Sequence, residues 1–497
     1  MKGVWMWPDS IIRHGAEKCV SYISRAGITD IFFLTKGLSG KTSYQGVFAP
    51  SVSERDLLKE LIHASHKSSI RVHAWFTSAC DEHYKSLFPS SGRCHFSRGR
   101  DRELITITDE DYIAYMENIV REVTSNYDID GLHLDYIRYN HILYGWSDEE
   151  ISQYESEGAD ISRLRELVSK TFYTKEDENA IFDAFRNGDA SAHAFSLVRR
   201  KNVNAFAGRL TQAAKEIKPG LSLSCSLMPE GAYDDKAFSD LHYGQNYSDL
   251  SGIFSLALPM AYSKAYDKNS EWVKDVYEKT AAFGFRTLTG LHAYQGGTSA
   301  SLKGDIKALS EAGTNDYCLF REGAFAYAFC LGAFVSIYNP TEKRIRLIQD
   351  SAQVSELSTE PGEEITFRPS ADFRCIYDDG TEVPVHTVSA ESVSSFSALQ
   401  VRRISEMEEI FTSITHAFMN LSASFTDFRN AEKDLKSLLS YYENGCWLKD
   451  YSDDEEGKLP ADLRRGVLSQ DGIDSLLCGI RTLKNEIKAF LNESVLE

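Results

Sequence analysis

The sequence predicts an α/β protein: a (β/α)8 barrel over residues 1–330, a small antiparallel β domain over 331–398 and a helical domain over 399–497. Two observations lead to this fold class. Short apolar strands alternate with amphipathic helices through the first 330 residues, which is typical of parallel βα units. After that point the pattern changes first to short strands between turn dipeptides, and then to long helical periodicity.

Eight strands are expected in the barrel segment, and amphipathic helices such as 54–68, 109–126 and 192–217 separate several of them. The strands are placed at residues 3–7, 28–35, 70–77, 130–139, 221–227, 255–260, 286–291 and 316–321. A doubly wound open sheet is the alternative. The first strand is not followed by the GxGxxG motif of the dinucleotide-binding form of that sheet.

Two long insertions are expected at the carboxyl ends of the strands, where barrel enzymes place their active sites. Residues 81–103 follow the third strand, and residues 140–189 follow the fourth and are acidic with a helical pattern. Loops of this length usually carry function or a structure of their own.

The C-terminal third predicts two further units. Strands at 333–337, 345–348, 364–367 and 374–377 lie between Asn-Pro, Pro-Gly and Asp-Gly turns. Beyond them an apolar stripe of helical spacing predicts a helical hairpin that packs on itself, with a partner-binding or self-associating coiled coil as the alternative. The stripe comprises Ile404, Met407, Ile410, Phe411, Ile414, Phe418, Leu421, Phe425 and Phe428, and it continues through Leu435, Leu438 and Leu439. A second amphipathic helix is expected at residues 472–491.

Charge and composition exclude several classes of function. A formal net charge of −19 argues against nucleic acid and anionic membranes as partners, because both require basic surfaces. The nine cysteines are scattered without CxxC pairs, and Met1–Pro8 resembles a strand rather than a secretion signal, so a cytoplasmic location is expected. The chain contains no HExxH, P-loop or GxSxG motif, and neither a metal nor a cofactor is expected.

Strand alternation selects Asp135 as the leading catalytic candidate. In the fourth strand Asp135 shares the inward face with His133, whereas Asp130 lies on the other face at the strand's start and is interpreted as structural. In the fifth strand the inward face carries Ser222, Ser224 and Ser226, and its continuation brings Glu230 to the barrel mouth. Two carboxylates on neighbouring strands are what cleavage of a glycosidic bond requires. The alternatives are an Asp135 that caps the next loop and a Glu230 that is simply solvated.

Other polar and aromatic residues on the inward faces or at strand ends form the expected substrate-binding environment. Aromatic rings near the mouth would stack on sugars, and Arg138 and Tyr139 follow Asp135 closely enough to orient it. The candidates are Trp5, Trp7, His73, Trp75, His133, Arg138, Tyr139, Tyr262, His292 and Glu322.

The run DGLHLDYIRY at residues 130–139 resembles the strand-four motif of the glycoside-hydrolase-like family related to glycosidase family 10. This resemblance implies a (β/α)8 barrel that acts on carbohydrate, and it matches Asp135 to the terminal acid of the motif. Glu230 lies in a segment where that family is more variable. Further similar segments occur in order at residues 2–5, 73–76, 199–204 and 258–262. Residues 441–471, with Trp447 and the run Arg465–Asp471, resemble a small bacterial domain of unknown function, which implies no activity.

The leading hypothesis is a glycoside hydrolase, with Glu230 as general acid/base and Asp135 as nucleophile or charge stabiliser. A catalytically silent carbohydrate-binding barrel with an interaction tail is the first alternative. A barrel enzyme of another class, such as a lyase or deacetylase that acts on glycans, is the second.

Overall fold

The computed structural model describes most of the chain in two compact units, Met1–Ala398 and Leu399–Glu497. The described residues are 1–171, 179–233, 235–294, 296–331, 334–349, 353–367, 369, 372–388, 398–460, 463–464, 466–468 and 470–493.

A nine-stranded parallel sheet forms a near-closed barrel in the first unit. Its strand order is β10-β11-β1-β2-β3-β6-β7-β8-β9, so β9 and β10 form its two edges although only Leu288 separates them in the chain. The strands are β1 (Lys2–Met6), β2 (Asp30–Lys36), β3 (Arg71–Thr77), β6 (Gly131–Asp135), β7 (Ser222–Leu227), β8 (Leu256–Pro259), β9 (Arg286–Thr287), β10 (Thr289–His292) and β11 (Tyr317–Phe320).

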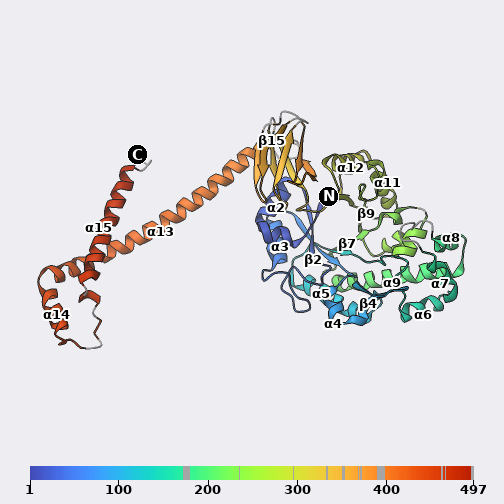
Figure 1. Ribbon diagram of the computed structural model, residues 1–497, viewed down its shortest axis with the longest axis horizontal. Coiled ribbons are helices and arrows are strands. Elements are labelled where there is room, and N and C mark those ends of the chain that lie inside the picture. Colours follow the sequence, from blue (N-terminus) through green and yellow to red (C-terminus); the bar gives the residue numbers. More distant parts are fainter. Residues whose placement is uncertain are drawn as a thin grey trace. The chain divides into compact units, whose positions relative to one another are not determined.

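Helices cover the outside of this sheet (Figure 1). The segment between β1 and β2 forms two helices, because Gly15 adopts a φ of 79° between α1 and α2. The helices are α1 (Pro8–His14), α2 (Ala16–Arg25), α3 (Leu57–Lys67), α5 (Glu110–Asn126), α9 (Ala190–Lys215), α10 (Tyr247–Leu250), α11 (Ser270–Ala281) and α12 (Ser299–Glu311), with short turns η3 (Pro229–Ala232) and η4 (Ser239–Tyr243).

Side chains alternate between two apolar layers, as the strand pattern requires. Inside the barrel, Trp5, Phe32, Trp75, Leu256, Leu258, Leu288 and Cys318 form one buried cluster. Neighbouring residues of the same strands, such as Val4, Ala74 and Ala257, belong to the larger cluster between sheet and helices. Buried polar residues also belong to the interior: Asp30 and His73 lie near one end of the barrel, and His133, Ser224, Ser226 and Asp135 lie nearer the other.

Both predicted insertions fold into structure of their own. After β3 come α4 (Glu82–Leu87), η1 (Pro89–Ser91) and a hairpin of β4 (Gly92–His95) and β5 (Gly99–Ile105). After β6 come α6 (Asp148–Ser156), α7 (Ile161–Ser169) and α8 (Ala180–Arg186), which pack with the start of α9 around a second apolar core.

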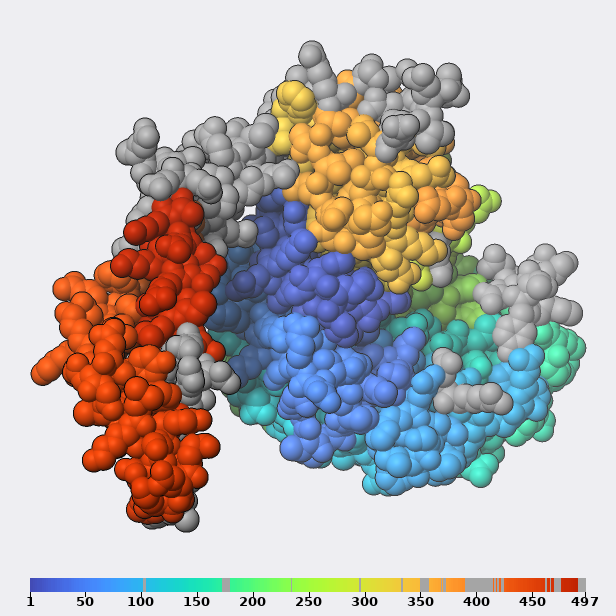
Figure 2. Space-filling view, turned by 60° about the vertical axis from the view of Figure 1, so that its left-hand side comes forward, coloured from blue at the N-terminus to red at the C-terminus, as the bar shows by residue number. Residues whose placement is uncertain are grey.

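Two four-stranded sheets follow the barrel. In Figure 2 the yellow and orange atoms of this segment lie against the dark blue atoms of the N-terminal part of the chain. The ring of Tyr22 in α2 stacks on Tyr338 at 3.4 Å, and Arg25 pairs with Glu364 at 2.9 Å. One sheet contains β12 (Ala326–Leu331), β13 (Phe334–Tyr338), β16 (Glu364–Phe367) and β19 (Val385–Val388); the other contains β14 (Ile345–Gln349), β15 (Gln353–Thr359), β17 (Phe373–Ile376) and β18 (Glu382–Val383).

This β-rich segment differs in two details from the expected all-antiparallel domain that begins at residue 331. Its first strand, β12, starts at Ala326, and β12 pairs with β19 in parallel. Residue 333, at the start of one predicted strand, lies outside the described residues.

The second unit is helical, with α13 (Ala398–Glu443), α14 (Cys446–Glu455), η6 (Gly466–Leu468) and α15 (Gln470–Glu493). A small core forms around Trp447 and Leu468. α13 is one continuous helix, as the spacing predicts. The described stripe residues Ile414, Leu421 and Phe425 are 63%, 64% and 58% exposed, so the expected helical hairpin does not bury these three side chains. Outside the described residues lie the side chains of five stripe residues, namely Ile404, Met407, Ile410, Phe411 and Phe418. The same holds for Arg465 and Ser469 of the tail motif. Throughout the described chain, each helix is too short or too polar to span a bilayer.

Candidate active site

A pocket of about 210 Å³ opens at the carboxyl ends of the barrel strands, where Asp135 ends β6. Among its lining residues, Asp135 is the only carboxylate. The pocket brings together six of the predicted site residues, namely Trp5, Trp7, Trp75, Asp135, Arg138 and Tyr262. Leu34, Leu38, Thr77, Tyr136, Ser226, Met260 and Phe320 complete the lining.

Asp135 is held by hydrogen bonds to both carboxylate oxygens. The indole Nε1 of Trp75 donates to Oδ2 at 3.2 Å, and the backbone N of Tyr136 donates to Oδ1 at 2.7 Å. Burial raises the pKa of Asp135, while the positive charge of Arg138 and these hydrogen bonds act in the opposite direction. Asp135 is thus a desolvated carboxyl group of fixed orientation, as a catalytic acid, base or nucleophile requires.

His133 lies one layer deeper and supports the pocket floor. Trp5 Nε1 donates to its Nε2 at 3.2 Å, and because an indole N–H can only donate, Nε2 is the acceptor and Nδ1 carries the proton. That Nδ1 lies 3.0 Å from Ser224 Oγ, while Ser226 Oγ lies 3.0 Å from Nε2 and also hydrogen-bonds Asp135. Burial lowers the pKa of His133 well below its ordinary value, so it is a neutral positioning residue.

Aromatic rings make up much of the pocket lining. The ring of Tyr262 stacks between Phe320 and His292, with centroid distances of 5.6 and 5.1 Å. The guanidinium of Arg321 lies 3.6 Å from the centre of the Trp7 ring. These contacts fix the rings as flat platforms of the kind that stack on sugars. His292 supports Tyr262 but is not among the residues that line the pocket.

Two other predicted substrate-binding residues are structural. His73 lies at the opposite end of the barrel, 2.8 Å from Asp30, where hydrogen bonds from His73 and Arg71 overcome the effect of burial and hold the pKa of Asp30 at about 2. Tyr139 donates to Glu150 at 2.8 Å, and the guanidinium of Arg199 lies 3.8 Å from its ring centre. Neither side chain lines the Asp135 pocket.

Glu322, the last of the predicted substrate contacts, lies behind β1 rather than in the pocket. It is 1% exposed and accepts a hydrogen bond from Ser10. Burial raises its pKa to about 7, although the Ser10 hydrogen bond and the charges of Arg13 and Arg321 oppose this rise.

This buried acid makes stability depend on pH. Between the ordinary pKa of 4.5 and about 7 the folded chain keeps a proton on Glu322 that the unfolded chain releases, so stability falls as pH rises through this window. We expect Glu322→Gln to be more stable than the wild type by about 3 kcal/mol at pH 8 and by less than about 1 kcal/mol at pH 5. Urea unfolding at both pH values measures the difference. The exposed control Glu54→Gln should change the free energy of unfolding equally little at both pH values. An equal effect of Glu322→Gln at pH 5 and pH 8 would contradict the raised pKa of Glu322.

Glu230 lies on η3, after β7, and is partly buried. Its side chain hydrogen-bonds Tyr266, whose pKa is raised by burial and then by the charge of Glu230. Tyr266 also lies within electrostatic reach of Arg138, a lining residue of the Asp135 pocket. Glu230 is therefore beside this part of the mouth, but it is not among the lining residues of the pocket.

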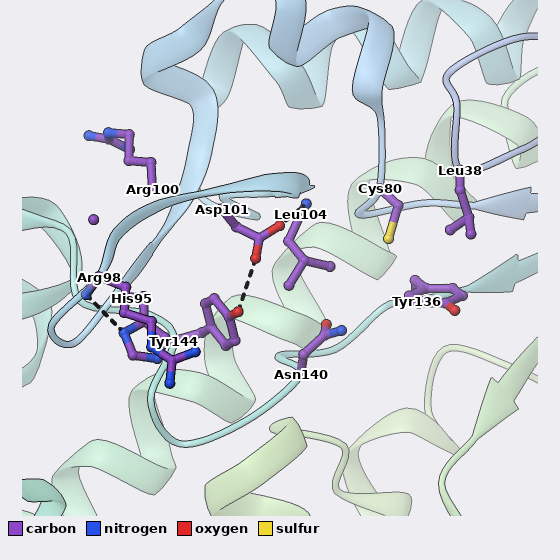
Figure 3. A pocket seen from close by; sticks show the side chains of 11 residues that line it. Leu38, Cys80, His95, Arg98, Arg100, Asp101, Leu104, Tyr136, Asn140 and Tyr144 are labelled. Atoms are coloured by element: carbon purple, nitrogen blue, oxygen red, sulfur yellow. Dashed lines mark hydrogen bonds between the residues drawn. The ribbon is translucent and has the colours of Figure 1, made fainter. Parts of the chain in front are cut away.

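A second, larger pocket of about 470 Å³ adjoins the first, because Leu38 and Tyr136 line both. The two insertions form most of its wall, through the β4–β5 hairpin and the loop after β6. Figure 3 shows Asp101, Tyr144 and Asn140 near its middle, with Tyr136 and Leu38 on one side and Arg100 on the other.

Sequence reasoning missed Tyr136, Ser226 and Phe320 as pocket residues. Strand alternation contains the signal for Ser226 and Phe320, because both lie on inward faces near the ends of β7 and β11. It contains none for Tyr136, which leaves the strand with a φ of 55°, a left-handed conformation that is rare outside glycine. Such strain is concentrated at functional sites.

Comparison with known proteins agrees with the resemblance seen in the sequence. Residues 50–282 match the family model "Glycosyl hydrolase-like 10". Residues 404–488 match the model "Domain of unknown function (DUF4298)". The chain is 21% identical over 332 residues to the glycosyl hydrolase DigH of Escherichia coli K12, an alignment that covers 58% of this chain and 67% of DigH. The same protein of Shigella flexneri matches equally.

The fold has relatives among solved structures. The glycoside hydrolase domain of PgaB (BpsB) from Bordetella bronchiseptica superposes with a TM-score of 0.53 at 12% identity, over 65% of this chain and 94% of that domain. At this identity the likeness concerns the fold alone. Together, the family model and the structural relative indicate a barrel of the glycosidase type.

Proposed function

We propose that the protein is a glycoside hydrolase whose reaction takes place at Asp135. The observation that carries this proposal is the Asp135 pocket itself: a desolvated, doubly hydrogen-bonded carboxyl group at the carboxyl end of a barrel strand, faced by fixed aromatic rings. A carboxylate beside stacking platforms suits the oxocarbenium-like transition state of glycosidic cleavage. We further infer that β9 and β10 act as one interrupted strand, which would make the sheet a (β/α)8 barrel.

In this proposal Asp135 attacks or stabilises the anomeric carbon. That role requires the ionised form, which the Trp75 and Tyr136 N–H groups and the charge of Arg138 favour against burial. A second group must protonate the leaving oxygen. Glu230 is the proposed donor, because it lies after the neighbouring strand β7 and is linked to the mouth through Tyr266.

The donor assignment predicts a distinct phenotype for Glu230→Gln. We expect kcat on natural glycosides to fall by about 10²-fold or more, because general acid catalysis contributes that much to glycosidic cleavage. Aryl glycosides with good leaving groups need less protonation, so their hydrolysis should be lowered less. The measurement compares an alkyl and a nitrophenyl glycoside of the same sugar. Full activity of Glu230→Gln on both glycosides would refute Glu230 as the proton donor, but it would leave the proposal of a glycoside hydrolase standing.

A carbohydrate-binding barrel without catalysis is the second candidate, and one observation favours it: Asp135 is the single carboxylate among the residues that line its pocket. Hydrolysis of a panel of nitrophenyl glycosides by the wild type separates the two functions. Release of nitrophenol supports the hydrolase. Binding of glycans without any hydrolysis of the panel would establish the binding barrel instead.

A further inference from the structure

The larger pocket beside the Asp135 site has no role in the proposed reaction. Two segments that are far apart in the sequence form most of its wall. The β4–β5 hairpin pairs with the loop after β6 through backbone hydrogen bonds, from Phe96 N to Leu143 O at 2.7 Å and from Gly145 N to Cys94 O at 3.0 Å. Backbone hydrogen bonds therefore join the two segments that form the pocket wall.

A buried cation joins the same two segments. The guanidinium of Arg93 is fully buried and donates to Ile105 O at 2.8 Å, to Arg138 O at 2.9 Å and to Asn140 Oδ1 at 3.2 Å. Because arginine can only donate, this contact identifies Oδ1 as the acceptor of Asn140 and leaves its Nδ2 as the donor on the pocket side. Arg93 thereby connects the β4–β5 hairpin to the segment that follows Asp135, and it orients the amide of Asn140.

The pocket offers both acceptors and donors. Asp101 is oriented by the Tyr144 hydroxyl at 2.9 Å and by Leu104 N at 2.9 Å. The amide of Asn140 and the side chains of His95 and Arg98 lie in the same lining, and burial lowers the pKa of His95, which favours its neutral form. Sugar hydroxyls both donate and accept, so a mixed set of fixed carboxylate, amide and hydroxyl groups matches them.

Tyr136 connects this pocket to the site of reaction. It directly follows Asp135, lines both pockets and adopts a left-handed conformation. Its backbone N donates a hydrogen bond to Asp135, and the Arg138 guanidinium lies 4.8 Å from its ring centre. A ring in this position can stack on a sugar on the way from one pocket to the other.

We propose that the larger pocket is a second sugar-binding subsite, and that the substrate is a chain of at least two linked sugar units that spans Tyr136. One unit occupies the Asp135 pocket, and a neighbouring unit is held by Asp101, Asn140 and Tyr144. The inference rests on the proposed function for the identity of the substrate as a glycan. In this proposal the two insertions make the protein prefer oligosaccharides to simple glycosides.

The test compares a nitrophenyl monosaccharide that the wild type hydrolyses with the nitrophenyl tetrasaccharide of the same sugar. For the wild type we expect kcat/KM to be higher on the tetrasaccharide. In Asp101→Asn and in Tyr144→Phe the ratio of the two kcat/KM values should fall by about 10-fold, mainly through KM, because hydrogen bonds that involve a charged group are lost. Asp148→Asn, an exposed aspartate in α6, is the matched control and should keep the wild-type ratio.

Failure of the subsite and failure of the proposed function give different results. If the wild type hydrolyses both substrates but both variants keep the ratio, the subsite is refuted and the hydrolase stands. If nothing is hydrolysed, calorimetry with cellotetraose, chitotetraose and maltotetraose decides. Binding that Asp101→Asn weakens and Asp148→Asn does not would support the subsite without hydrolysis, and binding of none of the three would overturn it.

Discussion

Asp135→Asn is expected to lower kcat by about 10³-fold on every glycoside that the wild type hydrolyses, because loss of a catalytic carboxylate or of a comparable charge costs this order of activity. The asparagine side chain has the same shape and can still accept a hydrogen bond from Trp75 or Tyr136, so folding should be preserved. Initial rates on a nitrophenyl glycoside measure the effect, and thermal unfolding checks the fold.

Asp130→Asn is the matched control on the same segment. Asp130 accepts a hydrogen bond from Val72 N at 2.8 Å and contacts His66 at 3.0 Å, at the end of the barrel away from the pocket. Its replacement should leave kcat within about twofold of the wild type, since surface changes away from the site alter little. If the two variants lose activity equally, or if Asp135→Asn remains fully active, Asp135 is not the reacting group.

Lys36→Met is expected to lower the free energy of unfolding by about 3–5 kcal/mol, because it leaves the carboxylate of Asp81 buried without its partner charge. Lys36 Nζ lies 2.9 Å from Asp81 Oδ2 and donates to Cys80 O at 2.8 Å, and both charged side chains are completely buried. The pair connects the end of β2 with the turn after β3, next to the pocket residues Leu38 and Cys80. Urea denaturation measures the loss.

Two controls show whether burial is the cause. In the double variant Lys36→Met/Asp81→Asn most of the loss should be recovered, because no buried charge remains and the asparagine can still cap α4 at Tyr84 N. Arg121→Met breaks the exposed pair with Glu216 and should cost less than about 1 kcal/mol. A loss of similar size in Arg121→Met and Lys36→Met would contradict this explanation.

Strand alternation explains why much of the barrel interior could be predicted. It placed Trp5, Trp75, His133 and Asp135 on inward faces, where the structure has them, because side chains of a strand point to opposite faces in turn. Strand alternation could not predict where along the barrel axis each inward side chain lies. His73 shares the inward face but lies beside Asp30 at the far end, since depth depends on the register between strands.

Residues beyond the strand ends were harder to place. Glu322 and Tyr139 follow strands as closely as pocket residues do, yet they turn into the core because Ser10 and Glu150 offer hydrogen bonds there. In the tail, helical spacing correctly indicated a helix. It did not indicate that Ile414, Leu421 and Phe425 would stay exposed, because periodicity describes a face and not what covers it.

By itself, the sequence determined the class of fold, the inward faces of β3, β6 and β7 and the selection of Asp135 over Asp130, all of which depend on local periodicity along one segment. Only the tertiary structure decided that two insertions separated by a strand and a helix meet beside Asp135, and that Tyr136 leaves β6 with a φ of 55° to line both pockets. Contacts between distant segments depend on the packing of the whole barrel, with Arg93 buried at their junction, and no local pattern contains them.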